Sequence, residues 1–393
     1  MTARRPTALR AGVRALAAAA AAGGVLVLAW LGPSAPRAAP GSGTIRVALV
    51  ESAPAVELRG ADVETVPLGA CGRCPGPARR TDAVRAVPAA GGVAIDGQVA
   101  AGFRLSASGP LRFAGRDYPP PLEIVRNGAG LAVINELPLE DYVVGVLIAE
   151  VGDRWPAEAL RAQAIAARTY AAHHRRIAAG KLYHLVASTA HQQYAGLAPA
   201  GSPARSAVLE TAGQVLRWEG AVFPAFYHTE SGGYTEDPRA VFAAPNMPAL
   251  RPVVCPFSVG SPHYYWTLDL SVADLTERLR RGGVDVGRIT GVEVAERTLS
   301  LRATAVTVRG TRGAARLRGN DFRRLVGYDA LKSTLFAVAV DGERASFAGR
   351  GYGHGVGLCQ WGAKAMAEQG YTAAQILEFY YPGTVLGTLE DER

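Results

Sequence analysis

One predicted helix in this sequence carries a glutamate on its apolar face. The segment opened by Pro138 repeats apolar residues at steps of three and four, and the next position on that face is Glu150. The apolar positions are Leu139, Tyr142, Val143, Val146 and Leu147. Burial and the negative end of the helix dipole both disfavour a charged carboxylate. The pattern therefore predicts a carboxyl group that keeps its proton near neutral pH, as a general acid requires.

Glu150 also has a structural interpretation, because three arginines follow it within the next eighteen positions. An ion pair with Arg154, Arg161 or Arg168 would hold the carboxylate in its charged form. The pattern alone leaves the catalytic and the structural interpretation open.

A second helix is expected from about residue 156 to residue 177, since a proline opens it and Gly180 follows its end. The segment is rich in Ala, so a neighbouring element can approach it closely. Gln163, Arg168 and Tyr170 interrupt that small surface. These three residues are candidates for contact with substrate, whereas the pattern alone favours a solvated face or structural hydrogen bonding for most of them.

Three loops combine polar residues with flanking glycines, at residues 188–196, 227–233 and 349–362. Glycine allows the backbone to approach a ligand closely, and binding residues collect in such loops. The candidate substrate-binding residues in them are His191, Gln192, Tyr194, His228, Ser231, Gly232, Gly233, His354 and Gln360.

Other chemistries for these loops are weaker. The G-x-G spacing around His354 lacks the Lys-Ser/Thr of a phosphate-binding loop and does not follow the first strand of a βαβ unit, so we predict no nucleotide site. A metal site built from His191, His228 and His354 stays open, although their linear spacing indicates no particular metal. A thiol dyad of His191 with Cys359 is disfavoured, because Cys359 lies in an apolar context.

The elements that must position these residues indicate an α+β fold. Residues 44–125 contain short strand-like runs separated by turns, and a hairpin over residues 122–134 leads into the helix of Glu150. Helices return over residues 360–369 and 373–379, where Thr372 and Gln375 form a capping box. We predict a β-rich N-terminal region over residues 41–120, a mixed α/β catalytic domain over 121–386, and a tail over 387–393.

Residues 1–40 have the pattern of an export segment. Four arginines precede an uncharged stretch from Ala15 to Leu31, which is consistent with a cleaved signal peptide or an N-terminal membrane anchor followed by a linker. These residues hold five of the arginines and no acid, so the net charge of +8 falls to +3 in the remainder. Such a balanced chain does not indicate nucleic-acid binding. Because of the export segment, we expect the rest of the chain to work outside the cytoplasm.

The cysteines are an even set, Cys71, Cys74, Cys255 and Cys359, which is compatible with disulfides in an oxidising compartment. Their pairing stays open. Cys71 and Cys74 also have the spacing of half a zinc knuckle, but no second ligand pair elsewhere completes it.

Five of these segments together resemble the stage II sporulation protein D (SpoIID) and LytB amidase-enhancer family. They occur in order at residues 137–150, 158–170, 191–194, 228–233 and 353–360, within a resemblance that covers about residues 121–386. The resemblance implies a peptidoglycan lytic transglycosylase that acts on glycan strands without stem peptides. It implies that Glu150 is the catalytic acid and base, and that the polar loop residues hold the N-acetyl sugars.

The sequence departs from the family pattern at two places. Some members bind zinc through His and Cys near residues 184–192, whereas this chain offers His184 and His191 without a cysteine, so we predict no cofactor and no metal. Leu358-Cys359 also replaces the usual Met-Ser or Leu-Ser before Gln360. Two alternatives stay open: a non-catalytic wall-binding module that stimulates an amidase, and a metal-dependent wall hydrolase that uses the histidines.

Overall fold

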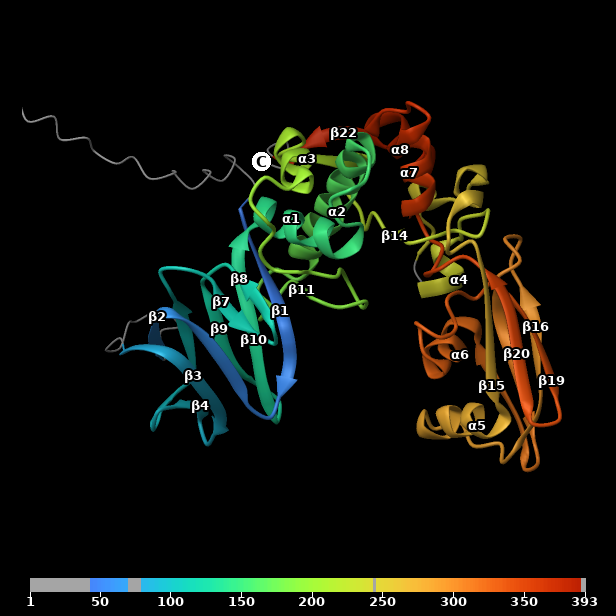
Figure 1. Cartoon of the computed structure of the whole chain (residues 1–393), viewed down its shortest axis with the longest axis horizontal. Helices are drawn as coiled ribbons and strands as arrows, with labels where there is room; N and C mark the ends of the chain where they lie inside the picture. Colours follow the sequence, from blue (N-terminus) through green and yellow to red (C-terminus); the bar gives the residue numbers. More distant parts are fainter. Residues whose placement is uncertain (1–42, 70–78, 243–244, 390–393) are drawn as a thin grey trace, which may run out of the picture. The chain divides into compact units, whose positions relative to one another are not determined.

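The computed structural model describes residues 43–69, 79–242 and 245–389 (Figure 1). Strands account for 40% of the chain and helices for 27%, and the strands dominate its N-terminal region, so the predicted α+β class is confirmed. The predicted export segment and Cys71 and Cys74 lie outside the described residues. Within the described ranges, no helix is both long and apolar enough to cross a membrane.

The N-terminal region forms one large sheet. Its strand order is β11-β1-β10-β9-β6-β2-β3-β4-β5, and β7 joins β2 and β8 beside this path. The strands are β1 Thr44–Ala53, β2 Val56–Leu68, β3 Arg79–Ala89, β4 Gly92–Ile95, β5 Gln98–Ala100, β6 Gly102–Ser106, β7 Leu111–Phe113, β8 Arg116–Tyr118, β9 Leu122–Asn127, β10 Gly130–Pro138 and β11 Leu185–Val186. All these pairs are antiparallel except β1 with β11.

This sheet extends across the predicted boundary between residues 120 and 121. β9 and β10 form the expected hairpin, and they also pair outward with strands from before the boundary, β9 with β6 and β10 with β1. Ile45 of β1 lies opposite Leu137 of β10, and both side chains are buried in the same core. The N-terminal strands are therefore part of the layer that supports the helix of Glu150.

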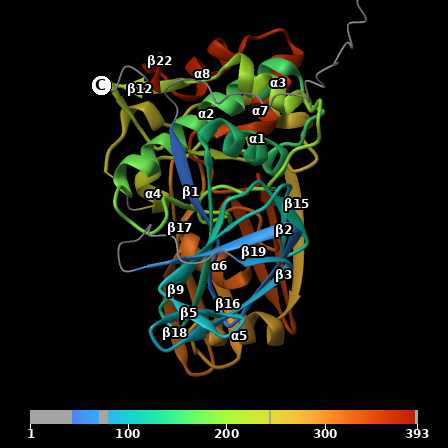
Figure 2. The same ribbon diagram turned by 90° about the vertical axis from the view of Figure 1, so that its left-hand side faces the viewer.

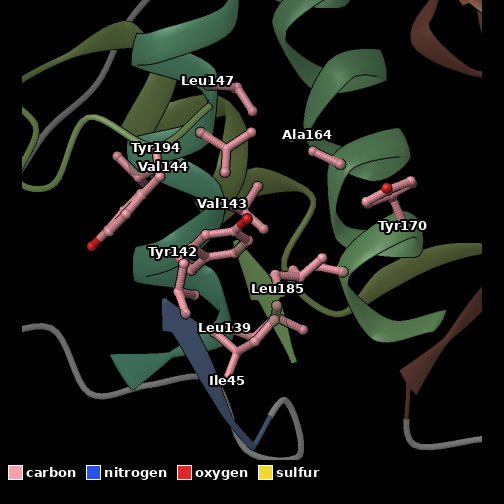
Figure 3. Packing of buried hydrophobic residues seen from close by; sticks show 14 of the residues in the cluster. Ile45, Leu139, Tyr142, Val143, Val144, Leu147, Ala164, Tyr170, Leu185 and Tyr194 are labelled. Atoms are coloured by element: carbon pink, nitrogen blue, oxygen red, sulfur yellow. The ribbon is translucent and has the colours of Figure 1, made fainter. Parts of the chain in front are cut away.

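Two helices begin just after the prolines that the sequence indicated. α1 spans Leu139–Glu150 after Pro138, and α2 spans Ala157–Ile177 after Pro156. Figure 3 shows α1 side chains such as Tyr142 and Leu147 in one apolar cluster with Ala164 of α2. The alanines of α2 leave room for this close approach. α3, at Pro203–Glu210, packs against both helices, and Figure 2 shows the three side by side.

The C-terminal part returns to the same core. α7 spans Gln360–Glu368 and α8 spans Ala373–Tyr380, with the predicted capping box of Thr372 and Gln375. Short strands join this part to the middle of the chain, in the orders β13-β12-β22 and β14-β21. Their bounds are β12 Gln214–Trp218, β13 Ala221–Val222, β14 Tyr227–His228, β21 Leu358–Cys359 and β22 Val385–Thr388.

Residues 266–347 contain a second apolar core. It is built on two three-stranded sheets, β15-β20-β19 and β16-β17-β18, with the helices α5 and α6. The bounds are β15 Tyr265–Ser271, α5 Val272–Arg281, β16 Ile289–Arg297, β17 Ala303–Gly310, β18 Gly313–Arg318, α6 Gly319–Val326, β19 Phe336–Asp341 and β20 Arg344–Arg350. The segment before it contains α4 Pro238–Phe242 and the 3-10 turns η1 Pro248–Leu250 and η2 Pro256–Gly260.

A buried ion pair joins α1, α2 and α3. The guanidinium of Arg168 on α2 lies 2.6 Å from the carboxylate of Glu140 on α1, and their side chains are 0% and 7% exposed. Arg168 also donates to the Val208 carbonyl of α3 at 3.1 Å and to the Gln214 carbonyl at 3.2 Å. The backbone N–H of Gly213 donates to Glu140 at 3.1 Å. Both charges are therefore compensated inside the core.

We predict that Glu140→Gln lowers the free energy of unfolding by about 3 to 5 kcal/mol, because it leaves the Arg168 guanidinium buried without its counter-charge. Glu343→Gln is the matched control, since it breaks a pair with Arg288 whose carboxylate side chain is 79% exposed. The control should change the free energy of unfolding by about 1 kcal/mol or less. Urea unfolding followed by circular dichroism measures both, and equal losses in the two variants would contradict the prediction.

Candidate active site

The carboxyl group of Glu150 lies at the C-terminal end of α1 and accepts two hydrogen bonds. The backbone N–H of Gln193 donates to Oε1 at 2.8 Å, and the Gln360 side-chain amide donates to Oε2 at 3.4 Å. The donors come from the loop after β11 and from the first residue of α7. Three segments far apart in the sequence therefore meet at this carboxyl group.

Burial raises the pKa of Glu150, and the two hydrogen bonds from Gln193 and Gln360 oppose that shift without cancelling it. Three tyrosines lie close enough to Glu150 for its charge to act on them, Tyr142, Tyr170 and Tyr227. Burial raises the pKa of each of them, and the negative charge of Glu150 adds to the rise. The surroundings of Glu150 thus shift its carboxyl group toward the protonated form.

The alternative ion pair of Glu150 does not form among the described residues. Arg168 pairs with Glu140, and Arg161 pairs with Glu158 and Glu210. Arg154 is exposed and is not among the ion pairs of the described chain. Glu150 accordingly keeps two neutral hydrogen-bond donors instead of a cation.

The predicted substrate contact of Arg168 is corrected by this geometry. Its guanidinium is fully buried and is occupied by Glu140 and by backbone carbonyls, so it is a structural residue. The sequence could not distinguish these roles, because an arginine inside an Ala-rich helix can form a buried ion pair or can bind a ligand.

Gln192 is also structural rather than exposed to a ligand. Its Oε1 accepts from the Tyr142 hydroxyl at 3.1 Å, and its Nε2 donates to the Ala167 carbonyl at 3.2 Å and to the Tyr227 hydroxyl at 2.8 Å. The residue is 1% exposed. Its hydrogen bonds join the loop to α1, α2 and β14, and they place the N–H of Gln193 on Glu150.

Tyr194 supports the same loop from the other side. Its hydroxyl donates to Asn135 Oδ1 at 3.0 Å, and its ring packs against Gly145 of α1. A Cβ at Gly145 would lie 2.3 Å from Tyr194 Cε2, so no larger residue fits there. The predicted substrate contact of Tyr194 is therefore corrected to a packing role, because the side chain is 1% exposed.

Gln163 and Tyr170 lie on α2, and His191 lies in the loop after β11. Gln163 is 2% exposed, and neither polar atom of its side-chain amide has a hydrogen-bond partner among the described residues. The Tyr170 ring stacks on His174 with centroids 4.0 Å apart. His191 Nδ1 accepts from the Val186 N–H at 3.1 Å. Substrate contact by these three residues stays a prediction.

The parallel pairing of β14 with β21 brings the two other glycine-flanked loops together. His228 lies opposite Cys359 in this pair, and its ring centroid is 5.5 Å from that of His354. His228 Nδ1 donates to the Val356 carbonyl at 3.1 Å, while its buried Nε2 has no partner among the described residues. Burial lowers the pKa of both imidazoles, that of His354 to about 3.

Ser231, Gly232 and Gly233 form the turn that follows β14. The Ser231 carbonyl accepts from the buried Arg302 guanidinium at 2.5 Å, and the Ser231 hydroxyl accepts from the Gly233 N–H at 3.3 Å. Gly232 has a φ of +74° and its N–H donates to the Glu230 carboxylate at 2.9 Å. The Ser231 side chain is fully buried, so its predicted substrate contact is corrected to a role in shaping this turn.

The described residues contain no group of three or more His, Cys, Asp or Glu arranged to hold a metal ion. His184 and His191, the two histidines near the family's zinc segment, accept hydrogen bonds from the backbone N–H groups of Arg46 and Val186 at 3.1 Å. These bonds occupy one ring nitrogen of each.

Sequence reasoning missed several groups around Glu150. The donor in the loop is the backbone of Gln193, and a backbone N–H leaves no signal in residue types. The rings of Trp155 and Trp361 meet edge to face at 5.5 Å, Trp361 directly follows Gln360, and Trp155 follows Glu150 by five positions. Their closeness in sequence to Glu150 and Gln360 could have identified the two tryptophans as candidates.

A groove of about 640 Å³ lies elsewhere, between β15, β19 and β20. Tyr265, Arg297, Leu301 and Arg350 line it, and none of its lining residues belongs to α1, α2 or α7. The shape of this groove therefore adds nothing to the environment of Glu150.

Comparisons with known proteins cover both cores. A family model described as Stage II sporulation protein matches residues 127–218, which include α1, α2 and Gln193. A second model, described as a domain of unknown function, matches residues 258–357.

Curated relatives extend this similarity over most of the chain. An uncharacterized protein of Brachyspira hyodysenteriae is 33% identical over 272 residues, which cover 68% of this chain and 72% of that protein. Stage II sporulation protein D of Bacillus subtilis is 31% identical over 269 residues, which cover 64% of this chain and 75% of that protein. The amidase enhancer of Bacillus subtilis is 30% identical over 290 residues, 62% of this chain and 40% of that protein. With its loops, helices and Glu150 in the matched region, this chain belongs to the stage II sporulation protein D family.

Proposed function

We propose that this protein is a peptidoglycan lytic transglycosylase with Glu150 as its general acid and base. The observation that carries the proposal is the Glu150 carboxyl group itself, which lies close to three tyrosines, is bonded by two neutral donors, and has a raised pKa. A carboxylic acid that keeps its proton toward neutral pH can protonate the leaving oxygen of a glycosidic bond.

The reaction needs one carboxyl group. Glu150 gives its proton to the oxygen that joins MurNAc C1 to GlcNAc, and the C1–O bond breaks through an oxocarbenium-like state. The 6-hydroxyl of the same muramoyl sugar then attacks C1, and its proton goes to the Glu150 carboxylate. The product is a 1,6-anhydromuramyl end, the acid is regenerated, and no water is consumed. No carboxylate contributes to the pKa shift of Glu150, which suits a mechanism without a second acidic residue.

The relatives suggest where the protein acts. Proteins named for sporulation and for enhancement of an amidase favour a role on the cell wall, outside the cytoplasm. An N-terminal signal or anchor in residues 1–40 would deliver the chain there. Denuded glycan strands are the substrate in this proposal, and a wall amidase that removes stem peptides is the expected partner.

The amidase enhancer supports a second candidate function, a wall-binding module that stimulates an amidase without cleaving glycan itself. The two functions differ in one product. Only the transglycosylase yields 1,6-anhydromuramyl ends from purified denuded glycan when no other enzyme is present.

We expect Glu150→Gln to lower the rate of anhydro-product formation by about 10² to 10⁴ fold, the usual contribution of general acid–base catalysis. The amide keeps the size of the side chain and loses the transferable proton. Mass spectrometry of the released fragments with 1,6-anhydromuramyl ends measures the rate. Glu343→Gln, which changes an exposed glutamate between β19 and β20, is the control and should cleave at the wild-type rate.

A folded Glu150→Gln protein that cleaves like the wild type would eliminate the catalytic assignment. If neither the wild type nor the variant cleaves, while both stimulate an amidase equally, the enhancer function replaces the enzyme.

We predict that the kcat/KM of cleavage falls as pH rises through the raised pKa of Glu150, because only the protonated carboxyl group can act as the acid. The midpoint of this descending limb should lie above about 4.3, the ordinary pKa of a glutamate. The folded state also holds this proton more tightly than the unfolded state, so the free energy of unfolding should fall over the same pH range. Glu150→Gln should remove that part of the stability profile, and an unchanged profile would contradict the raised pKa.

We expect cleavage to persist after exhaustive dialysis against a chelator, because the segment around His184 and His191 lacks the cysteine of the family's zinc-binding members. Elemental analysis of the purified protein should give clearly less than one zinc per chain. Stoichiometric zinc, with activity lost on chelation and restored by zinc alone, would instead favour a metal-dependent hydrolase.

A further inference from the structure

Four aromatic rings form a continuous row, and its first two members follow Glu150 and Gln360 closely in the sequence. Trp155 meets Trp361 at a centroid distance of 5.5 Å, Trp361 meets His263 at 5.9 Å, and His263 meets Tyr352 at 5.5 Å. All four residues are half-buried, so part of each stays accessible to solvent. We call these four residues the aromatic row.

The first two residues of the aromatic row, Trp155 and Trp361, are close to Glu150 and to its partner Gln360 along the chain. Trp361 directly follows Gln360, whose amide donates to Glu150 at 3.4 Å, and Trp155 lies in the short connection from Glu150 to α2. The backbone N–H of Trp361 also donates to the Thr229 carbonyl at 3.1 Å, which fixes the start of α7 beside the loop after β14. A chain bound at Glu150 therefore has the row within reach.

Two of the three lysines in the chain lie over rings of this row. The Lys364 ammonium is 5.2 Å from the centroid of Trp361, and the Lys332 ammonium is 5.8 Å from that of Tyr352. Lys364 is paired with Glu368 on its own helix. Lys332 forms no ion pair with the described residues, and its charge, after burial, lowers the pKa of His263. At the same end of the row the Tyr352 hydroxyl donates to the Asp329 carboxylate at 3.1 Å, so an acidic group also lies beside this ring. Among the described residues no carboxylate lies within ion-pair distance of the Lys332 ammonium itself.

We propose that the aromatic row and Lys332 form a binding surface for an anionic amino-sugar chain, with Lys332 selecting a carboxylate on the sugar. The apolar C–H face of a pyranose packs on an aromatic ring, and half-exposed Trp and Tyr offer such faces with polar tips. The identity of the sugar rests on the proposed function. A muramoyl residue without its stem peptide has a free lactyl carboxylate, whereas a peptide-bearing residue holds that carbonyl in an amide.

Such a surface would bind glycan strands without stem peptides more tightly than strands that carry them. An ammonium next to a free lactyl carboxylate gains a charge-assisted contact. The same ammonium gains nothing from a neutral chain of N-acetylglucosamine, which lacks the lactyl group. The rings of this surface would therefore stack on the sugars, and Lys332 would recognise the carboxylate. Substitutions can test the two roles separately.

The test measures binding in the full-length Glu150→Gln protein, so that cleavage does not consume the ligand. Isothermal titration calorimetry gives Kd for denuded glycan oligomers and for neutral oligomers of N-acetylglucosamine. Trp361→Ala should weaken binding of both by at least about tenfold, with partial recovery in Trp361→Phe. Lys332→Met, which keeps the apolar stem, should weaken only the denuded glycan, by about fivefold, and should reduce the salt dependence of its binding.

The matched control for Lys332 is Lys181→Met, which removes the remaining, exposed lysine. It should bind like the parent protein. Melting temperatures of all variants separate loss of binding from loss of folding.

Unchanged binding in folded Trp361→Ala would overturn the proposal, and an equal loss for both ligands in Lys332→Met would overturn the assignment of the carboxylate. Failure of the proposed function gives a different result. In that case the wild type does not cleave, yet the row variants still lose glycan binding, and the surface belongs to a wall-binding module.

Discussion

The three hydrogen bonds of Gln192 are the constraint on which the site depends. They connect the loop after β11 to Tyr142 on α1, to the Ala167 carbonyl on α2 and to Tyr227 on β14. Because all three are buried, losing one would leave a polar group without water or a partner. The loop therefore has one position relative to the helices, and in that position the Gln193 N–H meets Glu150.

Small residues make this arrangement fit. Gly145 allows the Tyr194 ring to lie directly on α1, and the alanines of α2 allow α1 to approach it closely. The Glu140–Arg168 pair then locks the two helices and α3 through charges that are satisfied only in this packing. The catalytic carboxyl group is held by a scaffold that tolerates little change in side-chain volume, which is why its own surroundings stay defined.

Local patterns in the sequence predicted the helices and strands well, but they did not predict which side chains pair with one another. Prolines and glycines marked α1 and α2, and helix spacing placed Glu150 on the buried face, because these properties depend on neighbours a few residues away. Whether Arg168 or Gln192 faces a ligand depends on residues 28 or more positions distant, such as Glu140 and Tyr142. The large sheet also joins strands on both sides of residue 120, a pairing over long separations that a short-range pattern does not contain.

The histidines of the loops and of α2 are held in their neutral form, which leaves Glu150 as the titrating group of interest. Burial lowers the pKa of His354 to about 3 and that of His174 to about 4, and it lowers those of His228 and His191 as well. A lowered pKa leaves an imidazole neutral at every pH above it, so these rings offer a donor and an acceptor without adding positive charge. The shift of the Glu150 pKa comes from burial and from the hydrogen bonds of Gln193 and Gln360, and none of these imidazoles is among its causes. The proton of the carboxyl group is therefore governed by burial and by the two neutral donors, Gln193 and Gln360.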